Sequence, residues 1–355
     1  MPSGRRSLQS EFALIRSLRN RFAAPDPRIV RGIGEDTAVI KTSDREWTLL
    51  TTDLLAEGVH FDLSTSSLED VGYRAAIANL SDIASMGGTP QYLLVALAIP
   101  SDLGNAAIQR LYRGMMKACR PFHVRLVGGD TSASLRGLFL SLTLTGLVEA
   151  GRPLRRDNAR IGDCIYVTGT LGDSQAGLRL LGAGTPRARP ASFPLPRADE
   201  RYLVTRHHRP SARVSEGRWL VTHRMATAAI DLSDGLAGDL RHLCDQSRVG
   251  AELFLSELPI SRQCMTFAGA RNLDPTMVAL IGGEDYELLF TVRSGDRKRF
   301  ESQARRARHR FTCIGVIRPR SFGLRIRTLI GTLRHLTAKG YEHFRPHPTH
   351  RESRP

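Results

Sequence analysis

The sequence predicts a two-domain protein whose halves both mix helices and strands, a chain of the α/β or α+β class. Its 355 residues are enough for two domains of ordinary size, each with its own core. Hydrophobic residues make up 41% and charged residues 24%, as in globular proteins. A loop rich in Gly, Arg and Asn at residues 149–162 separates the two halves. We therefore expect domains at residues 1–150 and 151–345, followed by a basic tail at 346–355.

The first half begins with an amphipathic helix over residues 10–22, which Pro25 ends. Residues 32–61 then form two strand-like segments that each deliver acidic residues at a turn. Ser67 and Asp70 have the spacing of a helix cap, and the helix that they begin ends at a pair of glycines. The pattern then predicts a strand at 92–99, a helix at 105–119, a short strand at 124–127 ending in GGDT, and a long strand at 138–148.

The second half repeats this alternation of strands and helices. The strand at 164–168 leads into the turn GTLGDS and a helix, and the turn could offer its amides to a phosphate. A Pro- and Arg-rich stretch at 184–200 is typical of an exposed insertion. The remaining pattern predicts strands at 228–232, 249–255, 286–292 and 311–317, and helices at 236–247 and 296–309.

Composition excludes several classes of protein. No apolar run approaches the ~20 residues of a membrane-spanning helix, and the N-terminus lacks the apolar core of a signal peptide, so we expect a soluble cytoplasmic protein. The cysteines are odd in number and contain no C-x-x-C pair, which disfavours a disulfide framework or a zinc site. The 51 Lys and Arg against 35 acidic residues give a net charge of +16. Because these cations are scattered without interleaved aromatics, nucleic-acid binding is disfavoured, and a basic surface that attracts anionic nucleotides is favoured.

Six aspartates share one context, following an apolar element or a glycine turn beside Thr, Ser or Asn. They are Asp36, Asp53, Asp82, Asp130, Asp231 and Asp234. Each alone is more often a turn former or a helix cap. Together they predict a site occupied by two or more Mg²⁺ ions that hold phosphate, because so many carboxylates would otherwise repel one another. The Walker loop, the G-x-G-x-x-G turn and the protein-kinase motifs are absent from the sequence, so a nucleotide would have to be held by metals and backbone turns.

Seven ordered blocks between residues 10 and 345 resemble the thiamine-monophosphate kinase family. The blocks are GIGEDTAV, TTDLLAEGVHF, ANLSDIASMGGTP, GGDTS, GDCIYVTGTLGDSQAGL, AIDLSDGLAGDL and GGEDYELLF. The resemblance implies the two-domain fold of aminoimidazole ribonucleotide synthetase, with an N-terminal sheet that forms a barrel in a homodimer. It also implies ATP-dependent phosphorylation of thiamine monophosphate to thiamine diphosphate by direct in-line transfer with several Mg²⁺ ions and no catalytic side chain.

The resemblance assigns roles position by position. Metal ligands would be Asp36, Thr51, Thr52, Asp53, Asp82, Asp130, Asp231 and Asp234; ATP would contact Gly129, Asp130, Arg156 and Ser233; thiamine monophosphate would contact His60, Glu284 and Tyr341. One departure stands beside the metals, where Glu35 replaces the usual first aspartate of the family. The 184–200 insertion and the basic tail have no assigned role.

Alternative activities on the same fold remain. Selenophosphate synthetase would need a reactive Cys and a Lys near the N-terminus, and residues 1–30 contain neither. The hydrogenase-maturation relative would need a C-terminal cysteine, but the chain ends in THRESRP. Aminoimidazole ribonucleotide synthetase stays open on architecture, although two of the blocks fit the thiamine enzyme better. A basic nucleic-acid-binding protein is the alternative from a different class.

Overall fold

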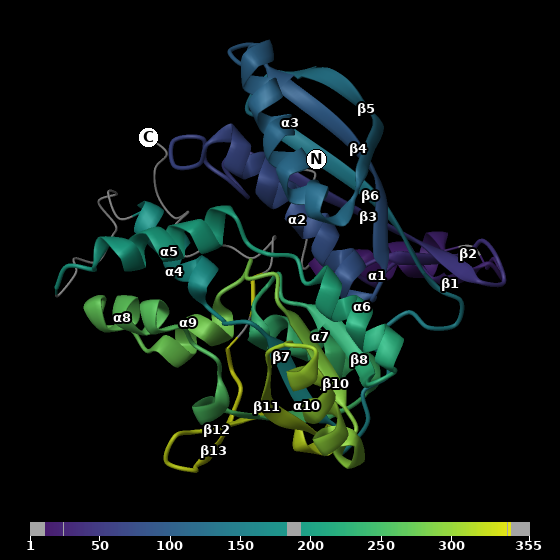
Figure 1. Ribbon diagram of the computed structural model, residues 1–355, viewed down its shortest axis with the longest axis vertical. Coiled ribbons are helices and arrows are strands. Elements are labelled where there is room, and N and C mark those ends of the chain that lie inside the picture. The colour runs from purple at the N-terminus through teal and green to yellow at the C-terminus, as the bar shows by residue number, and fades with distance from the viewer. Residues whose placement is uncertain (1–10, 24, 183–192, 339, 342–355) are drawn as a thin grey trace, which may run out of the picture.

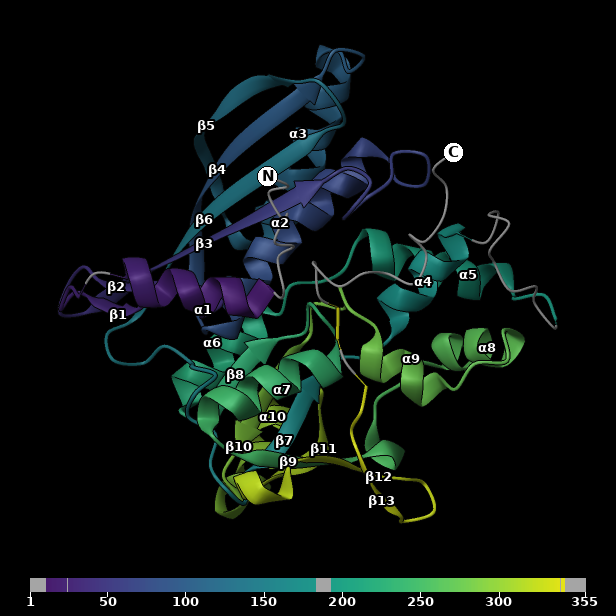
Figure 2. The same cartoon turned by 180° about the vertical axis from the view of Figure 1, so that it is seen from behind.

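A computed structural model describes residues 11–23, 25–182, 193–338 and 340–341 of the chain. Two sheets dominate it, one in each half, as Figure 1 and its reverse view in Figure 2 show. The first sheet has six strands in the order β1-β2-β3-β6-β4-β5, and the second has seven in the order β13-β12-β9-β11-β7-β10-β8. Most of the 184–200 insertion and all of the basic tail at 346–355 lie outside the described residues.

The first half contains three helices and six strands within the described residues. They are α1 (Glu11–Phe22), β1 (Ile29–Arg31), β2 (Ala38–Lys41), β3 (Glu46–Ala56), α2 (Leu68–Ser85), β4 (Thr89–Pro100), α3 (Asn105–Cys119), β5 (Arg125–Ser134) and β6 (Phe139–Glu149). The expected cap of α2 is confirmed, since the Ser67 side chain accepts a hydrogen bond from the Asp70 amide. The helix predicted at 105–119 has those bounds.

The second half surrounds its sheet with shorter helices. Its elements are β7 (Cys164–Thr168), α4 (Asp173–Leu181), α5 (Arg197–His208), α6 (Val214–His223), β8 (Ala226–Asp231), α7 (Leu236–Ser247), β9 (Gly250–Phe254), α8 (Arg262–Ala270), α9 (Pro275–Ile281), β10 (Leu288–Val292), α10 (Arg297–Arg306), β11 (Phe311–Arg318), β12 (Leu324–Arg327) and β13 (Leu333–His335). The predicted mixture of strands and helices in both halves is therefore confirmed.

Two of the predicted turns are strands. Thr51 to Asp53 lie inside β3, where Asp53 pairs with Leu142 of β6, and the GGDT segment lies inside β5, where Asp130 pairs with Ala96 of β4. Polar residues and glycines predict turns when they are considered alone, but hydrogen bonding to a neighbouring strand overrides that local preference. As a consequence, these side chains alternate between the two faces of the sheet.

The two faces of the first sheet differ. Leu93, Leu140 and Leu142 are fully buried on the face that α2 and α3 cover. The opposite face has no covering element within the described residues, and its side chains include Leu54, which is 60% exposed, and Tyr92, which is 47% exposed. In a single chain this sheet stays open, and none of the described strands closes it into a barrel.

Helix α2 is the element that joins the halves. It packs against α3 and β3 in its own half and against α6, β8 and α5 in the other. One apolar cluster therefore contains Leu80 and Ile83 of α2 together with Leu220 and Phe290 of the second half. None of the described helices is long and apolar enough to cross a membrane.

The crossing of α2 and α3 depends on two glycines. A Cβ atom on Gly114 would lie 1.8 Å from the Glu69 carbonyl oxygen, and one on Gly72 would lie 2.0 Å from that of Leu111. Since both obstacles are backbone atoms, a side chain could fit only if the helices moved apart.

We predict that Gly114→Ala lowers the free energy of unfolding by about 2 kcal/mol, because overpacking outweighs the gain in helix propensity. Urea denaturation measures the change. Gly104→Ala is the matched control, because a Cβ there meets no atom within 4 Å. Equal stabilities of the two variants would contradict the close helix crossing.

Candidate functional site

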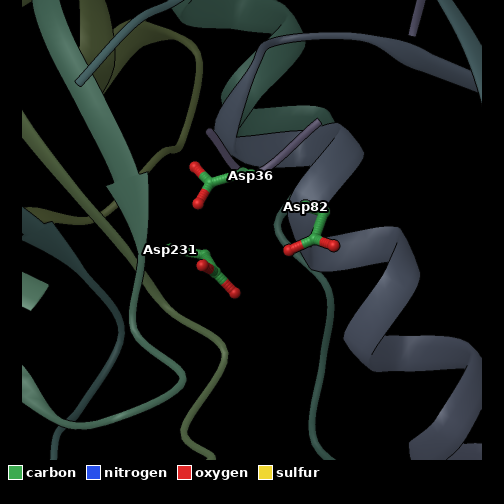
Figure 3. A group of neighbouring side chains, drawn as sticks. All are labelled: Asp36, Asp82 and Asp231. Atoms are coloured by element: carbon green, nitrogen blue, oxygen red, sulfur yellow. The ribbon is translucent and has the colours of Figure 1, made fainter. Parts of the chain in front are cut away.

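Three carboxylates from different elements meet where the two halves join. Asp36 lies in the turn before β2, Asp82 lies on α2, and Asp231 ends β8. One oxygen atom from each lies within 4.8 Å of the others, and Figure 3 shows the three side chains facing one space. The structure thus brings together three of the six aspartates predicted from sequence, from both halves.

Local structure fixes the direction of each carboxylate. Ser85, one turn beyond Asp82 on α2, donates a hydrogen bond of 2.8 Å to Asp36. Ser81, also on α2, donates one of 2.7 Å to Asp231, and Thr51 of β3 donates one to Asp82. The NLSDIAS segment of α2 therefore supplies both a carboxylate and the hydroxyl groups that orient its neighbours.

Asp53 of β3 interacts electrostatically with the same carboxylate cluster. Burial and repulsion from Asp231 raise its pKa to about 7. Burial also raises the pKa of Asp82 well above its usual value, and repulsion from Asp53 and Asp231 adds to this effect. The Asp53 Oδ2 atom is buried without a hydrogen-bond partner. A buried, charged oxygen without a hydrogen-bond partner destabilises the fold unless it binds a proton or a cation.

One arginine partly neutralises the cluster. Arg156 donates a hydrogen bond to Asp36, and its Nε lies 3.4 Å from the Glu35 carboxylate. Burial raises the pKa of Glu35 to about 7, although the charge of Arg156 opposes that rise. The predicted contact residue Arg156 therefore lies in the site, and Glu35, which replaces the expected aspartate, pairs with it.

Ser233, a predicted ATP contact, and Asp234, a predicted metal ligand, lie at the start of α7. Ser233 and Asp234 form the turn before this helix, and the Asp234 amide donates to Asp239 at 3.1 Å. Burial raises the pKa of Asp239 well above its usual value, and repulsion from Asp234 and Asp231 raises it further. A helix N-terminus carries partial positive charge, which suits phosphate oxygens.

His60, Glu284 and Tyr341, the predicted substrate contacts, gather beside the cluster. Arg74 of α2 donates a hydrogen bond to the His60 carbonyl oxygen and lies 3.7 Å from the Glu284 carboxylate. The Tyr341 amide donates to the Asp234 carbonyl oxygen at 3.1 Å. Burial raises the pKa of the Tyr341 phenol, and the negative charges of Asp234 and Glu284 contribute.

Thr52 and Asp130 do not reach the cluster within one chain. Both side chains are exposed on the open face of the sheet, whereas Asp53 shares the helix-covered face with the buried Thr51. Asp53 and the β5 residue Gly129 are separated by two strands, which corresponds to roughly 14 Å across the sheet. Gly129 itself is closely packed, since a Cβ there would meet the Val95 carbonyl oxygen at 1.9 Å.

The amides of the GTLGDS turn, which the sequence suggested could bind a phosphate, bind a carboxylate of the protein instead. Asp285 accepts hydrogen bonds from the amides of Gly172 at 2.6 Å and Ser174 at 3.0 Å. The turn is thereby tied to the GGEDYEL segment, and its amides hold a carboxylate of the protein itself.

Sequence reasoning missed several residues that complete the site. Ser81 and Ser85 could have been found from their positions one residue before and three after Asp82 on a helix. Asp239 carried a weaker signal, as an acid in the first turn of α7. No signal in the sequence pointed to Arg74, because its partners are distant from it in the chain.

Comparison with known proteins gives consistent matches. Residues 34–148 match the model of the AIR synthase related protein N-terminal domain, and residues 160–326 match that of the C-terminal domain. Thiamine-monophosphate kinase of Bacillus subtilis is 35% identical over 94% of this chain and 99% of its own length; that of Escherichia coli is 38% identical over 94% and 98%. A solved structure described as "AaThiL complexed with AMPPCP and TMP" covers 94% of this chain and 97% of its own, with a TM-score of 0.79 and 34% identity.

We predict that Asp53→Asn stabilises the metal-free protein at pH 8 by on the order of 2 kcal/mol, and that this advantage disappears near pH 4. The folded-state pKa of Asp53, about 7, lies above its unfolded value of 3.8. Its contribution to stability is therefore complete below pH 3.8 and is lost as the pH rises through 7, and Asn avoids that loss.

Unfolding by urea in the presence of a chelator, at several pH values, measures the difference. Asp44→Asn, at an exposed position of the same domain, controls for the chemical change. An advantage of the same size at pH 8 and pH 4 would show that Asp53 does not titrate as expected.

Proposed function

The chain belongs to the thiamine-monophosphate kinase family, and we propose that it transfers the γ-phosphoryl group of ATP directly to thiamine monophosphate at the carboxylate cluster between its two halves. Products are thiamine diphosphate and ADP. We place the reaction there because carboxylate oxygens of Asp36, Asp82 and Asp231, from three elements, lie within 4.8 Å of one another. Buried carboxylates that repel one another destabilise the fold, so a purely structural role does not explain their convergence.

The donor set fits Mg²⁺. Carboxylate and hydroxyl oxygens are the ligands that this ion prefers, and Asp53 Oδ2 is a buried oxygen without a hydrogen-bond partner. Asp36, Asp53, Asp82 and Asp231 would hold the ions, with Asp234 and the Thr51 hydroxyl beside them. When bound, Mg²⁺ neutralises phosphate oxygens and so lowers the repulsion between the two polyanionic substrates.

The proposed reaction requires no proton transfer to or from a side chain of the protein. The attacking group is a phosphate oxygen of thiamine monophosphate, and its second pKa of about 6 leaves it ionised at neutral pH. No general base is required for this reason. Arg156 provides a fixed positive charge next to Asp36, and the positive N-terminus of α7 beside Ser233 faces the nucleotide. Alignment of donor and acceptor then supplies the catalysis.

The organic part of the substrate would lie at His60, Glu284 and Tyr341. His60 belongs to the first half and the other two to the second. Arg74 connects His60 with Glu284, and the Tyr341 backbone is bound to Asp234. The substrate would therefore span the two halves, with its phosphate toward the aspartates.

We further propose that the active unit is a homodimer in which the open faces of two first sheets pack together as a barrel. The exposed apolar side chains on that face, among them Leu54, Tyr92 and Leu94, would be buried there. Asp130 of one subunit, on this face, would then lie beside Thr52 of its partner, next to Asp53 in the chain, and so complete the site of that partner. This arrangement would give a role to an edge strand that stays exposed in one chain.

We predict that the purified protein forms thiamine diphosphate and ADP from ATP, Mg²⁺ and thiamine monophosphate, and that chelation of Mg²⁺ abolishes the reaction. Asp53→Asn should lower turnover by about two orders of magnitude or more, because it removes a charged ligand. Chromatography of the thiamine phosphates measures the product.

Asp44→Asn is the control and should keep wild-type turnover. Product formed only from an aminoimidazole ribonucleotide precursor would assign the chain to the sister activity. Full turnover by Asp53→Asn would remove the metal-cluster mechanism.

A complementation experiment tests the dimer. We predict that Asp53→Asn and Asp130→Asn are each inactive as pure homodimers, but that co-expressed mixtures regain about a quarter of wild-type activity. Half of randomly formed dimers carry both variants, and one of the two sites in each such dimer has wild-type Asp53 and Asp130. No recovery in a mixture shown to contain heterodimers would place Asp130 in the site of its own subunit, and an active Asp130→Asn homodimer would place it outside the site.

A further inference from the structure

We infer that Arg74 is a positioning residue that fixes His60 and Glu284, one from each half, in the arrangement that binds the thiamine part of the substrate. The inference rests on the proposed function and adds a residue to it. Arg74 does not belong to the carboxylate cluster. It acts at the other end of the substrate, through the groups that it holds.

Arg74 contacts both halves from a buried position on α2. Its side chain is 3% exposed. One Nη atom donates to the carbonyl oxygen of His60, and the other lies 2.6 Å from Nε2 of His207 on α5. Its Nε lies 3.7 Å from the Glu284 carboxylate and has no hydrogen-bond partner. A distance of 3.7 Å is too long for a hydrogen bond, so this contact is an ion pair without one.

The contact with Arg74 determines the protonation of His207. A guanidinium group can only donate hydrogen bonds, so Nε2 of His207 must accept and the proton must be on Nδ1. That Nδ1 lies 3.1 Å from the Ser174 hydroxyl and 3.7 Å from the Glu284 carboxylate. Burial and the charge of Arg74 lower the pKa of His207 to about 2, so the imidazole stays neutral. Arg74 Nε and His207 Nδ1 therefore both lie 3.7 Å from the Glu284 carboxylate, and Ser174 is the hydrogen-bond partner of Nδ1.

Glu284 is held in a restricted backbone conformation. Its φ angle is 63°, and that of the nearby Tyr286 is 52°, in the left-handed region that residues other than glycine rarely adopt. The Glu284 amide donates to the Ser233 carbonyl oxygen at 2.8 Å. Such backbone strain clusters at ligand sites, where the surrounding structure must over-determine it. The Glu284 side chain, 30% exposed, thus has its backbone held by Ser233, and Arg74 and His207 lie 3.7 Å from its carboxylate.

A purely structural role would be redundant here. The same contact between α2 and the end of α5 also has an ion pair, in which Arg209 lies 2.6 Å from Asp70 at the periphery. Arg74, in contrast, is buried with one N–H unsatisfied, which disfavours stability. A buried arginine with an unsatisfied N–H beside Glu284 and the His60 segment is better explained by the substrate site.

We test this by replacing Arg74 with Met, which keeps a similar length without the charge, and with Lys, which keeps the charge without the planar donors. Arg74→Met should raise the KM for thiamine monophosphate about ten-fold or more, and change the KM for ATP less than about two-fold. Arg74→Lys should recover part of the loss. Arg209→Met is the matched control and should leave both constants within about two-fold of wild type.

The double variant of Arg74→Met with Glu284→Gln should lose less affinity for thiamine monophosphate than the sum of the two single losses, because Arg74 acts in part through that carboxylate. Additive losses, or an equal rise in both KM values, would overturn the inference. An equal rise in the KM for thiamine monophosphate in Arg209→Met and in Arg74→Met would also overturn it. If Arg74→Met does not fold, the same comparisons are made with Arg74→Lys. Wild-type protein that makes no thiamine diphosphate would instead refute the proposed function.

Discussion

Repulsion among buried carboxylates at the junction of the halves is the constraint on which the site depends. Asp53, Asp82 and Asp231 all have raised pKa values, and burial is the first cause for each. Such an arrangement is stable only with protons or cations in it. Because the members come from β3, α2 and β8, a cation that satisfied them would also join the two sheets.

Helix α2 separates the two kinds of chemistry along its length. Asp82 and its serine neighbours lie near the C-terminal end, and Arg74 lies two turns earlier, which corresponds to roughly 12 Å along the axis. The acidic end suits metal-bound phosphates, and the basic position holds the groups proposed for the organic part. A rigid helix buried between the halves therefore fixes the spacing between the reacting phosphate and the rest of the substrate.

The sequence allowed prediction of elements whose signals are local. Ser67 and Asp70 marked the start of α2, and helical periodicity defined α3 and α7. It could not show that Asp53 and Asp130 lie inside strands on opposite faces, because strand register depends on partners distant in the chain. The contact of Arg74 with Glu284 was hidden for the same reason. Residue identities thus predicted the chemistry of the site, whereas tertiary pairing decided which members meet within one chain.

Glu35 shows how the site accommodates a departure from its family pattern. Its longer side chain reaches Arg156, which also donates to Asp36. Arg156 is therefore shared by two acids, of which only Asp36 faces Asp82 and Asp231. When Asp36 serves a metal ion in the proposed complex, Arg156 keeps Glu35 as its partner and does not become an unpaired buried cation. In the proposed complex, Glu35 would thus supply the counter-charge that the neighbouring arginine requires.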